Sequence, residues 1–133
     1  MGSFNSFGST SKTYGAGKNI WHEISGTYPV GGTISNLSDF ASGTVIPSGS
    51  MCKYDAVNAT IKILTAADAT TTPTDVNGLL KEDIYVDDAV KGTNGAATGC
   101  VVYAGEIYVS RCVQDIPSTV LAVLPQIVAI KEA

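Results

Sequence analysis

The chain contains little of what most catalytic sites are built from. Among its 133 residues there is one histidine, His22, so a Ser-His-Asp or Cys-His arrangement would have to use it. His22 lies beside Trp21 in a glycine-rich region, where nothing predicts that its ring is held rigidly. No GxGxxG or GxxxxGK[ST] motif is present, so no phosphate-binding loop is expected. These absences predict a protein that is not an enzyme and uses no cofactor.

Charge is also scarce, at 15% of residues with a net charge of −4. The eight Lys and Arg residues are spread singly, whereas binding to a nucleic-acid backbone needs clustered positive charge. The acidic doublets Glu82-Asp83 and Asp87-Asp88 do not form a glycosidase pair by themselves, because adjacent residues of a strand point to opposite faces. The DxDxDG spacing of a calcium loop is missing. We therefore expect no nucleic-acid partner and no metal site, and we interpret the doublets as solvated loops.

Long apolar runs are missing too. No 18 consecutive residues are apolar, and the N-terminus lacks the apolar core of a signal peptide. No membrane partner is expected, and synthesis is expected in the cytoplasm. The three cysteines, Cys52, Cys100 and Cys112, form no CxxC pair and are interpreted as small apolar residues. The alternative is that Cys100 and Cys112 pair across neighbouring strands.

What the chain does contain is typical of strands and turns. It has 14 glycines and many Thr and Val residues, and it lacks the βαβ rhythm of a parallel nucleotide-binding sheet. Strands are predicted at residues 51–54, 60–64, 84–86, 100–104 and 106–109. The last two are predicted to form a pair joined through Gly105, which marks a bulge or tight bend. A β-turn is predicted at Pro47-Ser48-Gly49-Ser50.

The C-terminal region predicts a helix followed by a strand. Pro117 suits the first turn of a helix, Asp115 lies just ahead of it, and Pro125 ends the helix. Residues 126–131 then form a final strand. The predicted fold is mostly β: a compact β-sandwich or barrel-like domain with one short C-terminal helix and an extended N-terminal arm.

The arm is predicted at residues 1–26, ahead of a β-rich domain at residues 27–133. Its first 19 residues are rich in Gly, Ser, Thr and Asn and cannot bury enough apolar area to fold alone. Such a segment is either a disordered end or an arm that docks on another chain. Its aromatic residues are the candidate contacts: Phe4, Phe7, Tyr14 and Trp21.

Four segments in order carry a resemblance to a known family. Residues 43–50, GTVIPSGS, resemble the "GTVIPAG" strand and turn of small tailed-phage head proteins. Residues 77–84, NGLLKEDI, resemble their "GLLxEDI" segment, and residues 101–107, VVYAGEI, resemble their "VxxxGEV" strand. Residues 117–132 resemble the "LPxIxxxKE" ending of head-fibre proteins. The similarity spans residues 27–132 and is closest to head-fibre and lambda-type capsid decoration proteins.

The resemblance implies a structural virion protein on the capsid exterior. Such a protein forms a homotrimer on the outer shell, and its N-terminal arm reaches onto the major capsid protein. A chain of this length has no room for a long fibre shaft, which favours a compact capsid knob or the base of a fibre.

Two other function classes remain open. Four tyrosines on predicted strands could form an aromatic platform for a glycan on the host surface, as in a carbohydrate-binding or adhesive β module: Tyr54, Tyr85, Tyr103 and Tyr108. A small enzyme would have to use His22 and the acidic doublets.

Overall fold

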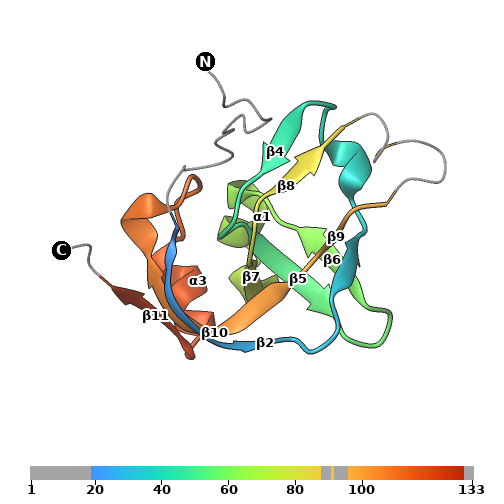
Figure 1. Cartoon of the computed structure of the whole chain (residues 1–133). Helices are drawn as coiled ribbons and strands as arrows, with labels where there is room; N and C mark the ends of the chain where they lie inside the picture. Colours follow the sequence, from blue (N-terminus) through green and yellow to red (C-terminus); the bar gives the residue numbers. More distant parts are fainter. Residues whose placement is uncertain (1–18, 88–90, 92–95, 131–133) are drawn as a thin grey trace, which may run out of the picture.

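The computed structural model describes residues 19–87, 91 and 96–130 (Figure 1). Over this part the protein is mostly β, with a main sheet that is curled and open. The strands are β2 (Trp21–Thr27), β3 (Gly32–Ile34), β4 (Thr44–Ile46), β5 (Met51–Asp55), β6 (Thr60–Ile63), β7 (Gly78–Leu80), β8 (Ile84–Val86), β9 (Thr98–Gly99), β10 (Val101–Tyr108) and β11 (Ile127–Ile130). The helical segments are η1 (Leu37–Asp39), α1 (Ala66–Thr71), η2 (Pro73–Asp75), η3 (Val109–Arg111) and α3 (Ser118–Val123).

The main sheet has the strand order β11-β10-β7-β5-β6-β3-β9, and β2 also pairs with β10. Two of its pairings are parallel, β10 with β11 and β3 with β6. Strands β4 and β8 form a separate antiparallel ribbon, which lies at the top of Figure 1, away from α3 and β11.

Strand β10 is the point where the sheet branches. Its first residues pair with β7 and its last four with β11, while β2 pairs with it from Val102 to Ile107. Because a strand has two edges, β2 must occupy one edge and β7 and β11 must share the other. This branching leaves the sheet open.

Two apolar cores lie on the two faces of the central strands. On β7, Leu79 packs into one core and Leu80 into the other, as expected from the alternation of side chains along a strand. The first, here called the helix core, includes Ala69 of α1 and Val120 of α3. The second, the ribbon core, includes Ile46 of β4 and Val86 of β8.

Several predicted local features agree with these elements. Strands β5, β6 and β8 lie where the sequence predicts them, and the predicted turn carries Gly49 at a φ of 87°, closed by a bond from the Ser50 N–H to the Pro47 carbonyl. α3 and β11 lie within the predicted C-terminal segments. A second helix, α1, begins with a capping box in which Thr65 and Asp68 bond each other's backbone.

The predicted strand pair around Gly105 is wrong. Residues 101–108 form a single strand, β10, and Gly105 lies at a register irregularity within it. A Cβ on Gly105 would lie 2.6 Å from the carbonyl oxygen of Glu23, so β2 can approach closely only because this residue is glycine. The glycine therefore bends one strand rather than joining two.

The arm predicted for residues 1–26 overlaps strand β2, so this boundary needs correction. Trp21 is 7% exposed, packs in the helix core, and donates its indole N–H to the Lys81 carbonyl at 3.0 Å. These contacts place Trp21 in the folded sheet rather than in an arm. The sequence did not predict this polar strand because its partner, β10, lies far along the chain.

The alternative in which Cys100 and Cys112 pair does not agree with the structure. All three cysteines are free. Cys100 lies just before β10 and Cys112 beyond its far end, and eight residues of strand span roughly 25 Å. Cys52 is buried in the ribbon core, while Cys112 packs against the helix core, where burial and then Asp115 raise its thiol pKa to about 11.

Candidate functional site

The first two segments of the family resemblance contact each other directly. The turn at residues 47–50 lies against β7, with bonds from the Gly49 N–H to the Leu80 carbonyl and from the Leu80 N–H to the Ser50 carbonyl. The Ser48 N–H donates to a carboxylate oxygen of Asp83 at 2.7 Å. The doublet Glu82-Asp83 is therefore not simply a solvated loop, because Asp83 holds the turn in place.

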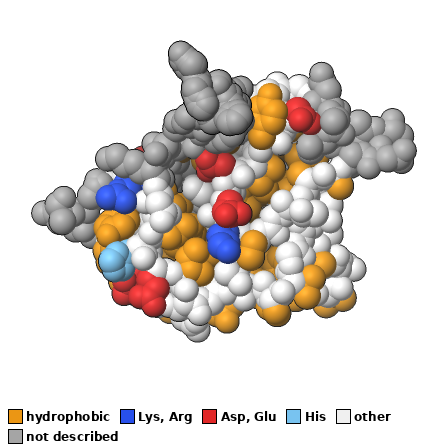
Figure 2. Space-filling model, viewed as in Figure 1, with side chains coloured by type: hydrophobic (Ala, Val, Ile, Leu, Met, Phe, Trp, Pro, Cys, Tyr) orange, Lys and Arg blue, Asp and Glu red, His pale blue; other side chains and the backbone are white. Residues whose placement is uncertain are grey.

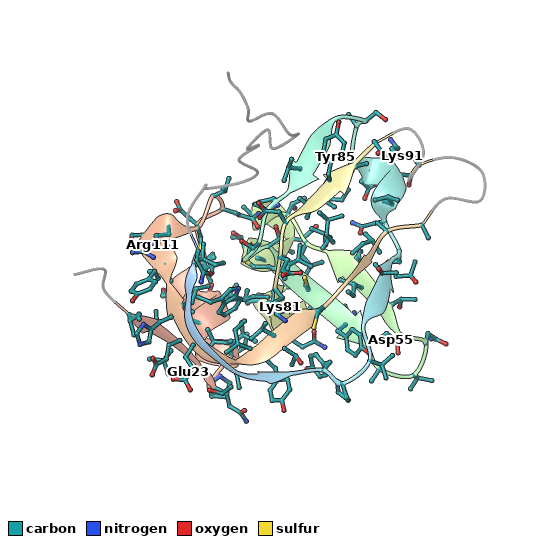
Figure 3. All side chains as sticks on the ribbon, in the orientation of Figure 1. Glu23, Asp55, Lys81, Tyr85, Lys91 and Arg111 are labelled. Atoms are coloured by element: carbon teal, nitrogen blue, oxygen red, sulfur yellow. The ribbon has the colours of Figure 1, made fainter. Side chains whose placement is uncertain are left out.

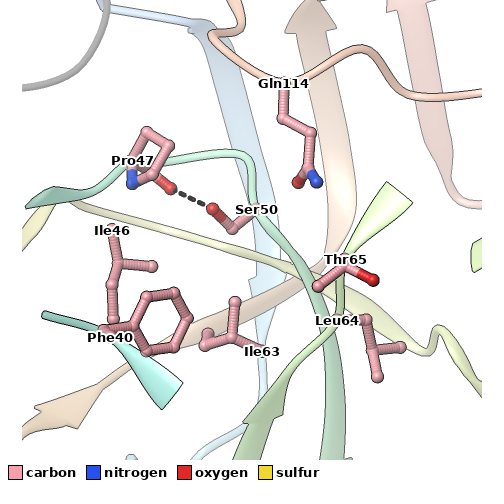
Figure 4. A pocket seen from close by; sticks show the side chains of 8 residues that line it. All are labelled: Phe40, Ile46, Pro47, Ser50, Ile63, Leu64, Thr65 and Gln114. Atoms are coloured by element: carbon pink, nitrogen blue, oxygen red, sulfur yellow. Dashed lines mark hydrogen bonds between the residues drawn. The ribbon is translucent and has the colours of Figure 1, made fainter. Parts of the chain in front are cut away.

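An apolar pocket of about 220 Å³ opens beside this turn (Figure 4). Phe40, Ile46 and Ile63 point toward one another at one side, and Gln114 reaches toward the pocket from the opposite side. The Ser50 hydroxyl donates to the Pro47 carbonyl at 2.7 Å, so this polar group is already bonded. The pocket can take an apolar side chain or a small apolar group.

The second hollow is a groove of about 320 Å³ with a different lining. Its wall combines aromatic, amide, hydroxyl and aliphatic side chains, and none of the residues that form it is charged: Tyr28, Thr74, Val76, Asn77, Tyr103, Val123, Leu124, Pro125 and Gln126. It lies between β10, the region of η2 and the end of α3. An uncharged wall of this kind suits a neutral, polar ligand.

Three tyrosines form a stack at this groove. Tyr28 stacks on Tyr54 with ring centroids 4.6 Å apart, and Tyr103 packs against Tyr28 at 5.1 Å. Tyr54 is 6% exposed and Tyr103 is 37% exposed, so the stack runs from the core to the surface. Burial, followed by the neighbouring tyrosines Tyr103 and Tyr54, raises the pKa of Tyr28 above its ordinary value.

The structure brings together only part of the predicted tyrosine platform. Tyr54 and Tyr103 share the stack, and Tyr28, which had not been predicted, joins them. Tyr85 lies on β8. In Figure 3 it is far from Glu23, which lies on β2, the strand that pairs with β10. Tyr108 instead contacts His22 near the end of β10. The sequence could not reveal these groupings, because each depends on which strands are neighbours.

His22 is held more firmly than the sequence predicts. Its Nδ1 lies 2.9 Å from the Tyr108 hydroxyl, and its Nε2 lies 3.7 Å from Glu106. The guanidinium of Arg111 lies 4.2 Å from the centre of the Tyr108 ring. The cluster is open to solvent, as the histidine beside acidic side chains in Figure 2 shows, and it lines neither hollow. Such a cluster can hold the exposed side chains of β2 and β10 in place.

Four of the remaining predicted residues lie outside the described part of the chain: Phe4, Phe7, Tyr14 and Asp88. Within the described ranges, no three His, Cys, Asp or Glu side chains come close enough to hold a metal ion. No helix in the described part of the chain could cross a membrane.

Comparisons with protein-family models, curated proteins and solved structures give no match to this chain.

Proposed function

We propose that the protein is a structural virion component that binds the outside of a tailed-phage capsid as a trimer and decorates or stabilises the head. The resemblance to head-fibre and lambda-type decoration proteins rests on four short segments in order. Each of these short sequences, taken alone, is common in strands and turns.

The observation that carries the proposal is how these segments meet in the fold. The first lies against the second through the β4–β8 ribbon and the bond from Ser48 to Asp83. The third lies in β10 and the fourth includes α3 and β11, and β10 and β11 pair in parallel from Gly105 to Tyr108. Segments that pack on each other in this way form a shared structural framework, which supports a family relationship better than separate strings do.

The two ends of the sheet suit assembly with neighbouring chains. In the described part of the chain, β11 and β9 end the strand order, and the exposed side of β11 includes Val128, which is 50% exposed. An edge strand offers unpaired backbone groups to another chain. The predicted compact sandwich or barrel-like domain also belongs to this proposal, and the curled main sheet with the β4–β8 ribbon supports it.

The start of the folded domain suits an arm that reaches outward. The Asn19 carbonyl accepts a bond from Arg111 at 2.9 Å, and the Asn19 side chain accepts from the Trp21 N–H at 3.1 Å. These bonds hold the chain at Asn19, the first described residue. We propose that Phe4, Phe7 and Tyr14 contact the major capsid protein, and we leave out Trp21 because it is buried.

The test mixes the purified full chain with expanded heads assembled without it. We expect a trimer by sedimentation equilibrium, saturable co-sedimentation with heads, and no binding to free capsid subunits. Replacing Phe4, Phe7 and Tyr14 together with Ser should weaken binding at least about tenfold, because three linked arms multiply each loss. Tyr85→Ser is the matched control for an exposed aromatic residue. A monomer that ignores the heads would overturn the proposal.

A further inference from the structure

We infer that the groove beside Tyr28 and Tyr103 is a binding site for a neutral saccharide. The site would act whether or not the protein sits on a capsid. It lies between the stack of three tyrosines on one side and the polypeptide around η2 and the end of α3 on the other.

Two of the three tyrosine hydroxyls are bonded to the protein's own backbone, and Tyr28 and Tyr103 line the groove. The Tyr28 hydroxyl donates to the Asn77 carbonyl at 3.2 Å, and the Tyr54 hydroxyl donates to the Val30 carbonyl at 2.6 Å. These bonds hold the stack in one orientation before any ligand arrives. A rigid aromatic face is the surface on which the apolar C–H side of a sugar ring packs.

The orientation of Tyr103 depends on a glycine of the neighbouring strand. A Cβ on Gly26 would lie 2.8 Å from Cζ and 2.9 Å from the hydroxyl oxygen of Tyr103. The ring therefore lies across β2 at a position where any larger residue would displace it. Gly26 leaves the space that the ring occupies, and Tyr103 remains 37% exposed.

The opposite wall supplies neutral polar groups. Thr74 and Gln126 are exposed there, and Asn77 lies between them and the tyrosines. The Asn77 amide is already occupied, since its oxygen accepts from the Tyr54 N–H at 2.7 Å and its nitrogen donates to the Tyr54 carbonyl at 2.9 Å. Thr74 and Gln126 are thus the side chains placed to bond sugar hydroxyls.

The chemistry of the lining favours a saccharide over other ligands. No lining residue carries a charge, so phosphates, nucleotides and sialylated glycans would find no counter-charge. Proline-rich peptides also bind aromatic grooves. The hydroxyls of Tyr28 and Tyr54 are turned to the protein's own backbone, so a peptide would have to use the same Thr74 and Gln126 side chains as a sugar, and a hexaproline peptide is therefore part of the test.

The test begins with the labelled full chain on an array of neutral and acidic oligosaccharides, followed by saturation-transfer NMR with the best neutral glycan. Tyr103→Ala and Gln126→Ala should each weaken binding at least about tenfold, while Tyr103→Phe should retain most of it because the ring face is kept. Gly26→Ala should also weaken binding, by displacing the Tyr103 ring. Tyr85→Ala, on β8, is the control and should bind normally. One-dimensional NMR spectra establish that each variant is folded.

Three results would overturn the inference. They are binding to no neutral glycan on the array, binding that Tyr103→Ala and Gln126→Ala in folded protein leave unchanged, and binding of a hexaproline peptide in the absence of glycan binding.

Discussion

The two cores of the protein share the same central strands but are covered in different ways. The helix core is closed by α1 and α3 and by the first part of β2, which is itself a strand of the main sheet. The ribbon core is closed by the two-stranded β4–β8 ribbon, whose strands pair only with each other among the described residues. The β2 part of the helix-core cover is paired along β10, whereas the ribbon meets the main sheet at the turn formed by residues 47–50. The difference indicates that the ribbon side is the more adaptable half of the molecule.

Both hollows lie where the two cores meet at the surface. The apolar pocket joins Ile63 of the ribbon core to Leu64 of the helix core, and the groove joins Tyr28 of the ribbon core to Leu124 of the helix core. Neither core completely covers the places where the pocket and the groove open. These two hollows therefore lie at the boundary between the two covers.

The largest expected effect comes from a matched pair on β7. Leu79 and Leu80 are both fully buried, one in each core. Leu79→Ala should lower the free energy of unfolding by about 3–5 kcal/mol, and Leu80→Ala by about 2–4 kcal/mol, because the ribbon can settle into the space left behind. Urea unfolding measures both. Equal costs, or a larger cost for Leu80→Ala, would contradict the view that the ribbon side is more adaptable.

A smaller effect is expected from removing the hydrogen bond that holds the turn after β4. Asp83→Ala removes the acceptor of the Ser48 N–H and should cost about 1–2 kcal/mol in the free energy of unfolding. Hydrogen exchange at Ser48 should speed up more than exchange in β10. The control is Glu82→Ala, since Glu82 is exposed. Unchanged exchange at Ser48 in Asp83→Ala would show that the bond does not hold the turn.

The smallest effect concerns the cap of α1, on the helix-core side. Bonds from Thr65, first from its backbone and then from its side chain, lower the pKa of Asp68. A carboxylate whose folded pKa is lowered stabilises the protein above its unfolded pKa of about 3.9, and that contribution is lost as the pH falls through the lower folded value. Asp68→Asn should cause a small fall in Tm at pH 7 that disappears near pH 2. A Tm difference that persisted at pH 2 would point to another cause.

Local features of the fold could be predicted from the sequence, because their causes are local. Ile61 and Ile63 alternate with Lys62 and form β6, and Pro117 precedes α3. The Pro47–Ser50 turn needed only Pro and Gly at the right spacing. Each of these signals lies within a few residues of the structure it specifies.

Features that depend on distant pairing could not be predicted. Strand β2 has a polar sequence and is ordered by β10, and the supports of His22 come from Glu106 and Tyr108. The tyrosine stack likewise joins three strands or loops that are far apart along the chain. Tyr54 and Tyr103 of the candidate site were predicted as strand tyrosines, but their grouping with Tyr28 required the strand order.

The branching at β10 has a consequence for how the chain folds. His22 on β2 and Tyr108 at the end of β10 are 86 residues apart, so β2 cannot find its partner until most of the chain has been made. At ~5–20 residues per second, that gap lasts roughly 4–17 s on the ribosome. Folding dominated by such distant pairs is slow. Strand β2 therefore joins the sheet late, and the main sheet is complete only after β10 has emerged.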